Sequence, residues 1–397
     1  MKIKKIIKKI LSRGYKFYTL KILYPFIYRL SSTGAVNDKK VVFIEVRGNK
    51  ISDNFALIYK RFESMEGYNI SEHFLGMSFA GRREYRKNCI AMLKDIGDAR
   101  FIFLNDSSNV TSCIPLRKES VLTQVWHGCG AFKKFGMSTA ELIFGDNRKT
   151  LMKYPYHRNY SHVTVSSPEV IWAYEEAMSL EGQKGVVKAL GLSRTDVFFQ
   201  EEYVNKSVEK IYRLFPCARG KKIILYAPTF RGRVAKAKAP DKLDIPMLYK
   251  ELGQDYVMLI KHHPFVKRAP EIDPAYAEFA KSVTTSATIE ELLCASDICI
   301  SDYSSLIFEY SLFSRPMIFF AYDLDEYYDW RGFFYDYKQL VPGPIFNNTK
   351  DIVSYIKDIE HKFQPELVEN FRKKYMSACD GHATDRIMKL LLEDKTL

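Results

Sequence analysis

The chain has 397 residues, of which 47% are hydrophobic and 14% aromatic; this excludes a disordered protein and suffices for two packed domains. The formal net charge of +13 favours an anionic partner, such as nucleic acid, an anionic membrane surface or a phosphorylated substrate. The seven cysteines are scattered without a Cys-x-x-Cys pair, which argues for a reducing compartment and against a structural zinc site. No uncharged apolar stretch of about 18 residues is present, so we expect no transmembrane helix.

The first thirty residues combine many basic side chains with an apolar face. No acidic residue precedes Asp38, and Ile3, Ile7 and Ile10 recur at helical spacing. We therefore expect residues 1–35 to form a basic amphipathic segment that lies in a membrane interface. Charges interrupt its apolar run, unlike that of a signal peptide. A basic docking face for protein or nucleic acid and a plain solvated helix are the alternatives. The residues expected to meet an anionic leaflet are Lys4, Lys5, Lys8, Lys9 and Arg13.

Between residues 36 and 200, short apolar runs alternate with helical patterns. We expect strands at 41–46, 101–104, 121–126 and 162–165, and helices at 54–65, around 82–87 and at 169–178. Alternation of this kind predicts a mainly parallel sheet that is covered on both faces. The charged helical stretch 197–220, next along the chain, is expected to bridge two domains.

The same pattern restarts after residue 220. We expect strands at 222–226, 256–260, 298–300 and 317–320, helices at 288–295 and 306–313, and a helical tail from Lys350. The residues from 201 to 397 therefore predict a second α/β domain. Because no repeat of fixed period is present, these are two similar architectures and not a solenoid.

The strand that ends at Trp126 is followed directly by His127. Ligands of open α/β sheets bind beyond the carboxyl ends of the strands. Histidine titrates near neutral pH and suits proton transfer, so His127 is the candidate general base; a histidine that only satisfies hydrogen bonds at the strand end is the alternative. Lys133 follows as a cation for the same crevice. Arg194 is another candidate, with an ion pair to Asp196 as its alternative.

Ser301-Asp302-Tyr303-Ser304-Ser305 lies between an expected strand and an expected helix. Free backbone amides at a helix start, together with serine hydroxyls, suit a phosphate group, whereas ordinary N-capping is the alternative. Glu309 stands one helical turn beyond this segment. Its carboxylate is placed either to reach a ribose or to face solvent.

Two further strand ends in the second half carry cations. Two adjacent histidines cannot both face one crevice if strand alternation persists, and in Lys261-His262-His263-Pro264 we prefer His263. The guanidinium of Arg231 is suited to binding a diphosphate. A solvated turn and a surface arginine are the respective alternatives. Asp323-Leu324-Asp325 resembles a metal-holding Asp-x-Asp motif of sugar transferases, but it lies in an acidic, aromatic stretch, 322–330, that we expect to be a loop without metal.

Taken in order, these segments resemble the CDP-glycerol glycerophosphotransferase family of teichoic acid synthesis. The resemblance covers roughly Val41 to Arg386. It implies a GT-B-like fold, in which two Rossmann-like doubly wound domains face a central cleft, with an acceptor domain at 36–200 and a CDP-glycerol-binding domain at 201–397. It also implies peripheral attachment to the cytoplasmic face of the cell membrane. The matching segments are Trp126-His127-Gly128, Lys133-Lys134-x-Gly136, Gly191-x-x-Arg194-x-Asp196, Tyr226 to Arg231, Lys261-x-His263-Pro264 and Ser301 to Tyr310.

Members of this family transfer glycerol phosphate from CDP-glycerol to a lipid-linked acceptor and release CMP. The resemblance implies that His127 is the catalytic base and that His263 is a second catalytic residue. Glu309 stands where the family usually has aspartate, and the segment 128–131 is closer to the pattern of priming members. The residues expected to bind substrate are Lys133, Arg194, Arg231, Lys261, Ser301, Asp302, Ser304, Ser305 and Glu309.

The expected partners are CDP-glycerol, an undecaprenyl-diphosphate-linked acceptor and an anionic membrane surface. We expect no nucleic acid and no metal cofactor, and homo-oligomerisation is left open. A ribitol-phosphate or capsule-polymer transferase on the same scaffold is the nearest alternative. A GT-B glycosyltransferase that uses a nucleotide sugar is a second. The third, of a different class, is a non-enzymatic polyanion-binding protein, which would leave the polar strand ends unexplained.

Overall fold

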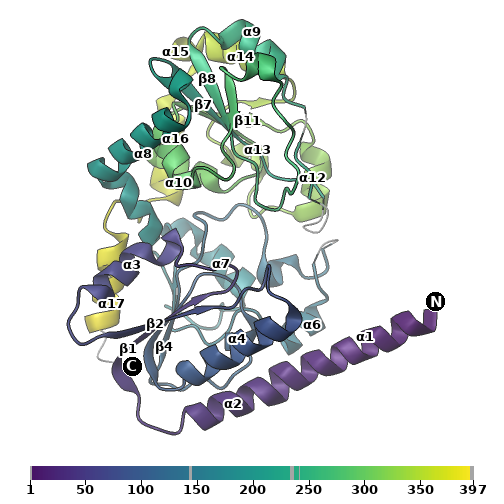
Figure 1. The fold of residues 1–397 in the computed structure, drawn as a ribbon, viewed down its shortest axis with the longest axis vertical. Helices are drawn as coiled ribbons and strands as arrows, with labels where there is room; N and C mark the ends of the chain where they lie inside the picture. Colours follow the sequence, from purple (N-terminus) through teal and green to yellow (C-terminus); the bar gives the residue numbers. More distant parts are fainter. Residues whose placement is uncertain (1, 143–144, 233–236, 241, 394–397) are drawn as a thin grey trace. The chain divides into compact units, whose positions relative to one another are not determined.

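The computed structural model describes residues 2–142, 145–232, 237–240 and 242–393, and of residues 2–9 and 328–331 only the backbone. These residues form two compact units that are interleaved along the chain (Figure 1). Unit 1 takes in the described residues of 1–127, 135–194 and 382–397, and unit 2 those of 128–134 and 195–381.

Unit 1 is built on a six-stranded sheet in which all the strand pairs are parallel, in the order β2-β1-β3-β4-β5-β6. The strands are β1 (Asn37–Glu45), β2 (Asn69–Phe74), β3 (Ala99–Leu104), β4 (Val121–Gln124), β5 (His162–Thr164) and β6 (Val187–Lys188). The rings of Phe43 and Phe103 stack on neighbouring strands with centroids 4.8 Å apart. The direction of winding changes between β1 and β3, and such switch points are where doubly wound sheets bind ligands.

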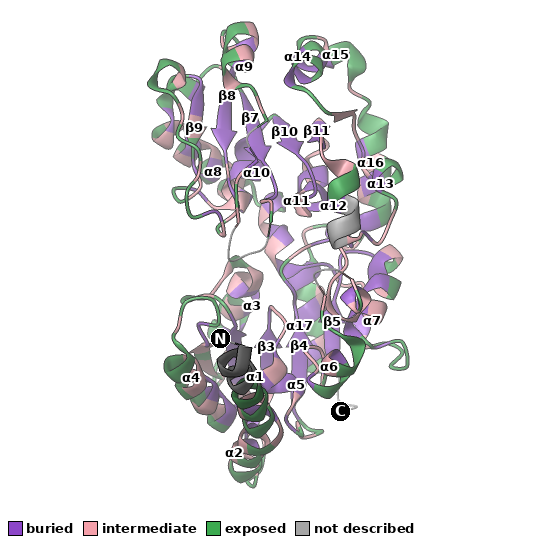
Figure 2. Ribbon diagram, turned by 90° about the vertical axis from the view of Figure 1, so that its right-hand side faces the viewer, coloured by how far each residue is buried: buried purple, intermediate pink, exposed green. Residues whose placement is uncertain are grey.

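The helices of unit 1 cover this sheet, and its middle strands β3, β4 and β5 are largely buried (Figure 2). They are α3 (Asp53–Glu63), α4 (Arg82–Asp95), α5 (Asn109–Ser112), α6 (Arg148–Lys153), α7 (Ile171–Met178) and α17 (Ala383–Glu393), with the short helices η2 (Gly136–Thr139) and η3 (Pro168–Val170). The last helix belongs to this unit because its apolar face, with Ile387 and Leu391, packs in one cluster with Val41 and Phe55.

The N-terminal residues form one continuous helical rod, which carries a π-helical turn. Its parts are α1 (Lys2–Phe17), the π-helix η1 (Tyr18–Leu23) and α2 (Tyr24–Ser31). The π turn lies directly before Pro25, which has no N–H to donate to the preceding turn. Tyr24 and Tyr28 are buried against unit 1, and the Tyr28 hydroxyl accepts a hydrogen bond from the Arg117 N–H at 3.1 Å. The helix that we predicted here is thus present, and its second half is anchored on unit 1.

Unit 2 has a second all-parallel sheet, in the order β12-β11-β10-β7-β8-β9. Its strands are β7 (Lys222–Ala227), β8 (Tyr256–Ile260), β9 (Ala280–Ser282), β10 (Ile298–Ser301), β11 (Met317–Phe320) and β12 (Ile345–Phe346). The middle strands are mostly apolar and are buried except for Lys222 at the start of β7, as expected for a sheet covered on both faces. This is the Rossmann strand order, and its switch point lies between β7 and β10.

The helices of unit 2 flank this sheet. Thr288 and Glu291 form a reciprocal capping box at the start of α10, which explains why that helix begins where it does. The helices are η4 (Ser193–Phe199, at the border between the units), α8 (Glu201–Leu214), η5 (Pro216–Ala218), α9 (Ile245–Leu252), η7 (Pro274–Tyr276), α10 (Ile289–Ala295), α11 (Leu306–Tyr310), η8 (Ser311–Phe313), α12 (Leu324–Arg331), α13 (Tyr337–Leu340), α14 (Thr349–Lys357), α15 (Ile359–Lys362) and α16 (Pro365–Tyr375).

The strands predicted from apolar runs are present in both units. The prediction was wrong for 322–330, expected as a loop, because α12 occupies Leu324–Arg331. The strand expected at 121–126 ends two residues earlier, at Gln124. The predicted domain ranges are contiguous, 36–200 and 201–397, whereas the compact units exchange two segments, 128–134 and the C-terminal helix. Within the described part of the chain, we find no helix with the length and apolarity needed to cross a membrane.

Candidate functional site

His127 follows a strained turn at the end of β4. Trp126 has φ of 56°, which places a bulky residue in the left-handed region. The side chain of Gln124 stabilises this turn, because its Oε1 accepts the Trp126 N–H at 3.0 Å while its Nε2 donates to the Asp106 carbonyl at 3.1 Å. The Trp126 ring stacks on the imidazole with centroids 4.4 Å apart. Backbone strain of this kind persists only where surrounding contacts hold the residue in place, and it is common at functional sites.

The tautomer of His127 follows from its hydrogen bond. Its Nδ1 lies 2.9 Å from the carbonyl oxygen of Asn105, at the end of β3. A carbonyl can only accept, so Nδ1 carries the proton and the neutral ring keeps Nε2 as an acceptor. Histidine held in this way is set to receive a proton at Nε2.

Asn105 is itself fixed by a buried polar network at the ends of β1 and β3. Its Nδ2 donates to Glu45 Oε2 at 2.7 Å and to Ser52 Oγ at 3.0 Å, and the Ser52 N–H donates to Glu45 Oε1 at 2.6 Å. Glu45 and Asn105 are almost completely buried. Sequence reasoning missed both residues, although Asn105 directly follows a predicted strand. The network lies at the switch point of unit 1, where the fold places ligands.

Asp106 and Arg47, which are charged, and His157, which is neutral, complete the surroundings of His127. Burial alone would raise the pKa of Asp106, but the nearby His127 and Arg47, which donates its Nε–H to Asp106 Oδ2, lower it below its ordinary value. Burial lowers the pKa of His157 to about 4, so this ring is neutral at pH 7, with its Nδ1 3.1 Å from the Tyr160 hydroxyl. The Asp106 carboxylate therefore lies beside one permanent cation, Arg47, and beside the His127 ring.

Arg194 supports the backbone of His127. Its Nη1 donates to the His127 carbonyl at 3.2 Å and to Asn54 Oδ1 at 3.3 Å. The structure thus brings two of the residues singled out in the sequence, His127 and Arg194, into direct contact within unit 1. The substrate-binding role expected for Arg194 stays a prediction.

The peptide bond from His127 to Gly128 carries the chain from unit 1 into unit 2. The segment Gly128–Lys134 joins unit 2 through backbone hydrogen bonds, from the Lys134 N–H to the Gly332 carbonyl and from the Phe334 N–H to the Phe132 carbonyl, both at 3.1 Å. Gly130 has φ of 63°, and a Cβ there would lie 2.3 Å from the Phe308 ring. The glycine is therefore required by close packing.

The switch point of unit 2 is held together by Asp302. Its Oδ1 accepts the Thr229 N–H at 2.8 Å and its Oδ2 accepts Arg231 Nη1 at 2.9 Å. Ser301 is buried and donates its hydroxyl to the Ala227 carbonyl at 2.8 Å. These contacts tie the end of β10 to the end of β7. Both Ser301 and Asp302 were predicted to bind substrate, and the structure has their side chains engaged inside the protein.

Arg231 lies between two carboxylates and against tyrosine rings. It donates Nε–H and Nη2–H to the two oxygens of Asp323, in addition to its bond with Asp302. Its guanidinium carbon lies 5.1 Å from the Tyr303 ring centroid and 5.4 Å from that of Tyr327. Burial would lower the pKa of Arg231, but the two carboxylates raise it above its ordinary value. This cation is neutralised within the protein, so the expected grip on a diphosphate stays a prediction.

Ser304 and Ser305 precede α11 and are half-buried. The Ser304 Oγ accepts a long hydrogen bond from the Leu306 N–H at 3.4 Å. A Cβ built on Gly128 would lie 3.4 Å from Ser305 Oγ, so the glycine segment passes close to this serine. Glu309 is 1% exposed, which rules out the solvent-facing alternative for its side chain.

Lys261 and His263 follow β8. The Lys261 ammonium donates to the carbonyls of Thr284 at 2.9 Å and Ala287 at 2.6 Å, and burial lowers its pKa. His263 accepts the Phe265 N–H at Nδ1 over 3.1 Å, so the neutral ring carries its proton on Nε2. The two predicted histidines therefore have opposite tautomers: Nε2 is an acceptor in His127 and a donor in His263.

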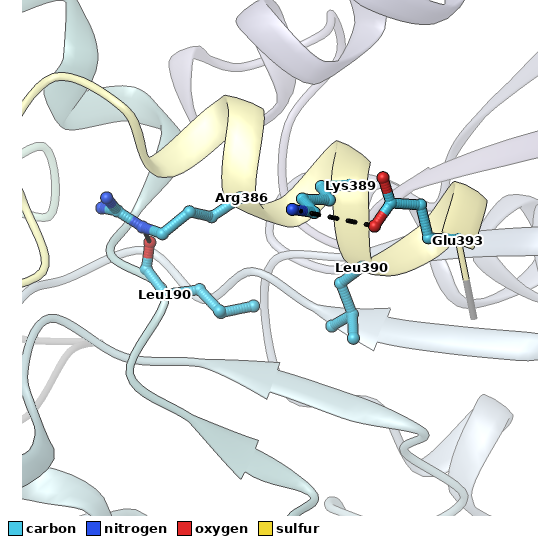
Figure 3. A pocket seen from close by; sticks show the side chains of 5 residues that line it. All are labelled: Leu190, Arg386, Lys389, Leu390 and Glu393. Atoms are coloured by element: carbon cyan, nitrogen blue, oxygen red, sulfur yellow. Dashed lines mark hydrogen bonds and ion pairs between the residues drawn. The ribbon is translucent and has the colours of Figure 1, made fainter.

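A cavity of about 270 Å³ lies beside the switch point of unit 2. It is lined by Lys133, Thr229, Phe230, Arg231, Gly232, Asp323, Glu326 and Tyr327. Another cavity, of about 490 Å³, lies in unit 1 beside α17, where Arg386 donates to the Leu190 carbonyl (Figure 3). It contains none of the predicted site residues, and we assign it no chemistry. Among the described residues, no group of three His, Cys, Asp or Glu side chains could hold a metal ion.

Together these features define a protein of two parallel-sheet α/β domains, of the GT-B-like type, with polar residues at both switch points. A family model described as CDP-Glycerol:Poly(glycerophosphate) glycerophosphotransferase matches residues 26–393. The chain belongs to this family, which confirms the resemblance seen in the sequence.

The similar proteins include both ribitol-phosphate and glycerol-phosphate enzymes of teichoic acid synthesis. The chain is 34% identical to the teichoic acid ribitol-phosphate primase of Bacillus spizizenii, over 90% of this chain and 92% of that protein. It is 29% identical to the teichoic acid glycerol-phosphate primase of Bacillus subtilis, over 77% of each. It also matches the poly(ribitol-phosphate) polymerase of B. spizizenii at 34% identity, but spans only 58% of that longer protein.

Solved structures agree on the fold. The wall teichoic acid polymerase TagF superimposes with a TM-score of 0.75 at 23% identity, over 99% of this chain and 98% of that chain. A UDP-GlcNAc 2-epimerase from Neisseria meningitidis superimposes with a TM-score of 0.57 at 13% identity, over 89% of this chain and 100% of that one. An epimerase and a polymerase share this architecture, so the fold alone does not select the chemistry.

Proposed function

We propose that this chain transfers glycerol phosphate from CDP-glycerol to a hydroxyl of a lipid-linked teichoic acid precursor and releases CMP. The observation that carries the proposal is the hydrogen bond from His127 to the Asn105 carbonyl, in a chain of this family. It leaves Nε2 of a histidine as a proton acceptor at a strand end, which is what activation of an acceptor hydroxyl requires.

In the proposed reaction, His127 Nε2 removes the proton of the acceptor hydroxyl. The acceptor oxygen then forms a bond to the phosphorus that bears glycerol, while the bond from that phosphorus to the bridging oxygen breaks and CMP leaves. The imidazolium that forms keeps its Nδ1–H bond to Asn105 and lies within the field of Asp106. A positioned general base of this kind typically contributes about 10²–10⁴-fold in rate.

The donor is proposed to bind at the switch point of unit 2. Ser304 and Ser305 supply hydroxyls, Lys133 lines the neighbouring cavity, and His263 offers an N–H at Nε2. These donors suit the charge that develops on the phosphoryl oxygens. Arg231 acts in this proposal as a positioning residue, because its bonds to Asp302 and Asp323 hold the loops after β7, β10 and β11.

We propose that the transfer needs no metal ion. Both oxygens of Asp323, the first carboxylate of the Asp-x-Asp motif, accept hydrogen bonds from Arg231, and its Oδ1 also accepts the Tyr303 hydroxyl at 2.9 Å. Activity that survives EDTA treatment supports this part of the proposal. Loss of activity on chelation, restored by added Mg²⁺, would contradict it.

CDP-ribitol is the second candidate donor. The observation in its favour is the similarity to a ribitol-phosphate primase, which covers more of this chain, at higher identity, than that to the glycerol-phosphate primase of B. subtilis. The proposed mechanism is the same for both donors, since only the polyol attached to the transferred phosphorus differs.

Peripheral attachment to the inner face of the cell membrane is also part of the proposal. The rod exposes apolar side chains at Ile10, Leu11, Tyr18 and Phe26, and Arg13 is exposed among them. The side chains of Lys4, Lys5, Lys8 and Lys9, also expected to contact the membrane, lie outside those described. Apolar and basic side chains on one helix favour an anionic interface.

The N-terminal rod offers a direct test of this attachment. Removal of residues 2–14 leaves the buried Tyr24 and Tyr28 in place and should release the protein from phosphatidylglycerol vesicles while donor turnover on a soluble acceptor persists. Vesicle binding that is unchanged by the truncation would refute the membrane assignment.

The main experiment measures CMP release from CDP-glycerol, CDP-ribitol and UDP-glucose. Each donor is offered with an unprimed lipid-linked disaccharide and with the same acceptor bearing one glycerol phosphate. Turnover of CDP-glycerol supports the proposal, and the preferred acceptor distinguishes a primase from a polymerase. Turnover of CDP-ribitol alone selects the second candidate. Turnover of UDP-glucose alone, or of no donor, would reject both.

A further inference from the structure

Three lysine side chains converge on one aromatic ring where the N-terminal rod packs on unit 1. The ammonium nitrogens of Lys16, Lys21 and Lys153 lie 4.7, 5.9 and 5.5 Å from the centroid of the Tyr154 ring. Lys16 and Lys21 come from α1 and η1, whereas Lys153 ends α6. Lys153 also lies 5.3 Å from the ring of Phe17. Residues far apart in the sequence thus place their positive charges around a single point.

A fourth cation joins this group. Burial raises the pKa of the Cys113 thiol, and Lys21, Arg158 and Lys16 act against that rise. Arg158 therefore lies in the same electrostatic neighbourhood as the two rod lysines. Lys16, Lys21 and Lys153, which surround the Tyr154 ring, form the basic cluster of unit 1, and Arg158 adds to the positive charge that reaches Cys113.

The basic cluster is not neutralised by neighbouring carboxylates. Among the described residues, neither its three lysines nor Arg158 has an Asp or Glu oxygen within the 4.0 Å of an ion pair. The side chain of Glu141 is engaged at the start of α6, where it accepts the backbone N–H of Arg148. Like charges gathered in this way repel one another, so the arrangement favours a bound anion with more than one negative charge.

The surface around the basic cluster is apolar. Met152 on α6 is 66% exposed, and Tyr18 and Ile22 on η1 are 49% and 50% exposed, so two of the three elements that supply the lysines also expose apolar side chains. Basic side chains beside exposed apolar ones fit a ligand that has an anionic head and a hydrocarbon tail, whereas a soluble phosphate would leave the apolar side chains in water.

We propose that the basic cluster around Tyr154 binds the diphosphate of the lipid-linked acceptor. This inference rests on the proposed function, because it assigns a site to the acceptor of that reaction. It goes beyond a general attraction to the membrane, since it requires a specific diphosphate at a fixed place on unit 1. The rod would then deliver the acceptor lipid as well as contact the bilayer.

The test compares vesicles that carry equal charge. Phosphatidylcholine vesicles are doped either with undecaprenyl diphosphate or with phosphatidylglycerol, and binding of the full chain is measured by co-sedimentation. The variant Lys16→Gln/Lys21→Gln/Lys153→Gln should bind the diphosphate vesicles about a hundredfold more weakly, from about fivefold for each lysine in direct contact with the diphosphate. Its binding to phosphatidylglycerol vesicles should change far less.

Two further variants control for charge and folding. Lys60→Gln/Lys94→Gln/Lys184→Gln removes the same charge from exposed lysines on α3, on α4 and before β6 and should leave the selectivity for diphosphate unchanged. Lys16→Arg/Lys21→Arg/Lys153→Arg keeps the cations and should retain binding. Equal weakening on both kinds of vesicle, or no weakening on either, would overturn the proposal.

A kinetic measurement separates this inference from the proposed function. With an active enzyme, the triple glutamine variant should raise the KM for the lipid acceptor and leave both kcat and the KM for the donor near their original values. A rise in the donor KM instead would contradict the assignment. If no donor is turned over at all, the proposed function fails, whereas the vesicle comparison still decides whether the basic cluster recognises a diphosphate lipid.

Discussion

The two switch points of this molecule arrange their charges in opposite ways. In unit 1 one carboxylate, Asp106, lies close to a permanent cation, Arg47, and to a histidine. In unit 2 one cation, Arg231, lies between two carboxylates, Asp302 and Asp323. In the first arrangement the charges of Asp106 and Arg47 balance, whereas in the second the two carboxylates leave an excess of negative charge.

This difference bears on how each unit treats its proposed substrate. A base that must hold a proton during the reaction benefits from the nearby carboxylate in unit 1. A diphosphate approaching unit 2 meets no net positive charge from Arg231 and its partners. Recognition there must come from hydroxyls, N–H groups and Lys133, which lines the cavity. Substitutions in each unit can therefore test the two arrangements separately.

The largest effect is expected at His127. Replacement by alanine removes the acceptor nitrogen while Ser304 and Ser305 remain, so kcat for CMP release should fall by about 10²–10⁴-fold with donor binding retained. Stopped assays measure turnover and calorimetry measures donor affinity. The control is His361→Ala, an exposed histidine on α15 that should behave as the original protein does. Turnover close to normal in His127→Ala would remove the general base from the mechanism.

The next effect concerns the stability of unit 2. Arg231→Met leaves Asp302 and Asp323 without their cation, and the free energy of unfolding should fall by about 3–5 kcal/mol, as measured by urea titration. Further replacement of both carboxylates by asparagine should recover part of this loss. The control is Arg219→Met, which breaks an exposed pair with Glu209 and should cost at most about 1 kcal/mol. Equal losses from the two arginine variants would show that the buried pair has no special role.

The sequence predicted much of this fold, because the central strands are short apolar runs followed by polar motifs. It also placed His127 and the segment from Ser301 to Ser305 at strand ends, where the structure has them. None of the four edge strands, β2, β6, β9 and β12, was predicted, because β6 and β12 have only two residues each and β2 and β9 carry polar, partly exposed side chains and no apolar run. Likewise the acidic, aromatic stretch 322–330 gave no clear helical pattern.

The contacts that define each site could not be predicted from the sequence. His127 is held by a backbone carbonyl, and every residue has one, so nothing in the sequence singles out Asn105. The sequence did not show that Arg231 pairs with Asp323, because Asp323 lies 92 residues further on in a stretch that was assigned to a solvated loop. Without that partner, the arginine was assigned to a diphosphate. Long-range pairings of this kind depend on strand order, which sets which loops meet at a switch point.

A smaller effect is expected from Asp106→Asn. The pKa of Asp106 lies below its unfolded value near 3.8, so the carboxylate contributes stability above about pH 4 and loses it as the pH falls through the folded pKa. The variant should therefore be less stable by about 1–2 kcal/mol at pH 7, and the difference should shrink below about pH 4. Its kcat should also fall, by about tenfold, without a matching change in donor KM. Urea titrations at several pH values provide the measurement. Asp38→Asn, at an exposed site, is the control, and a difference independent of pH would refute the account.

The smallest effect is expected from Lys133→Gln. Lys133 lines the cavity beside Arg231 and adds a positive charge to that lining. Its loss should raise the KM for the CDP-polyol donor about fivefold, from roughly 1 kcal/mol for one partly exposed charge contact, while kcat changes little. Lys338→Gln, at an exposed site on α13, removes the same charge away from the cavity and should leave the KM unchanged. If both variants raised the KM equally, the effect would belong to the net charge of unit 2, and the donor would have to be held by hydroxyls and N–H groups alone.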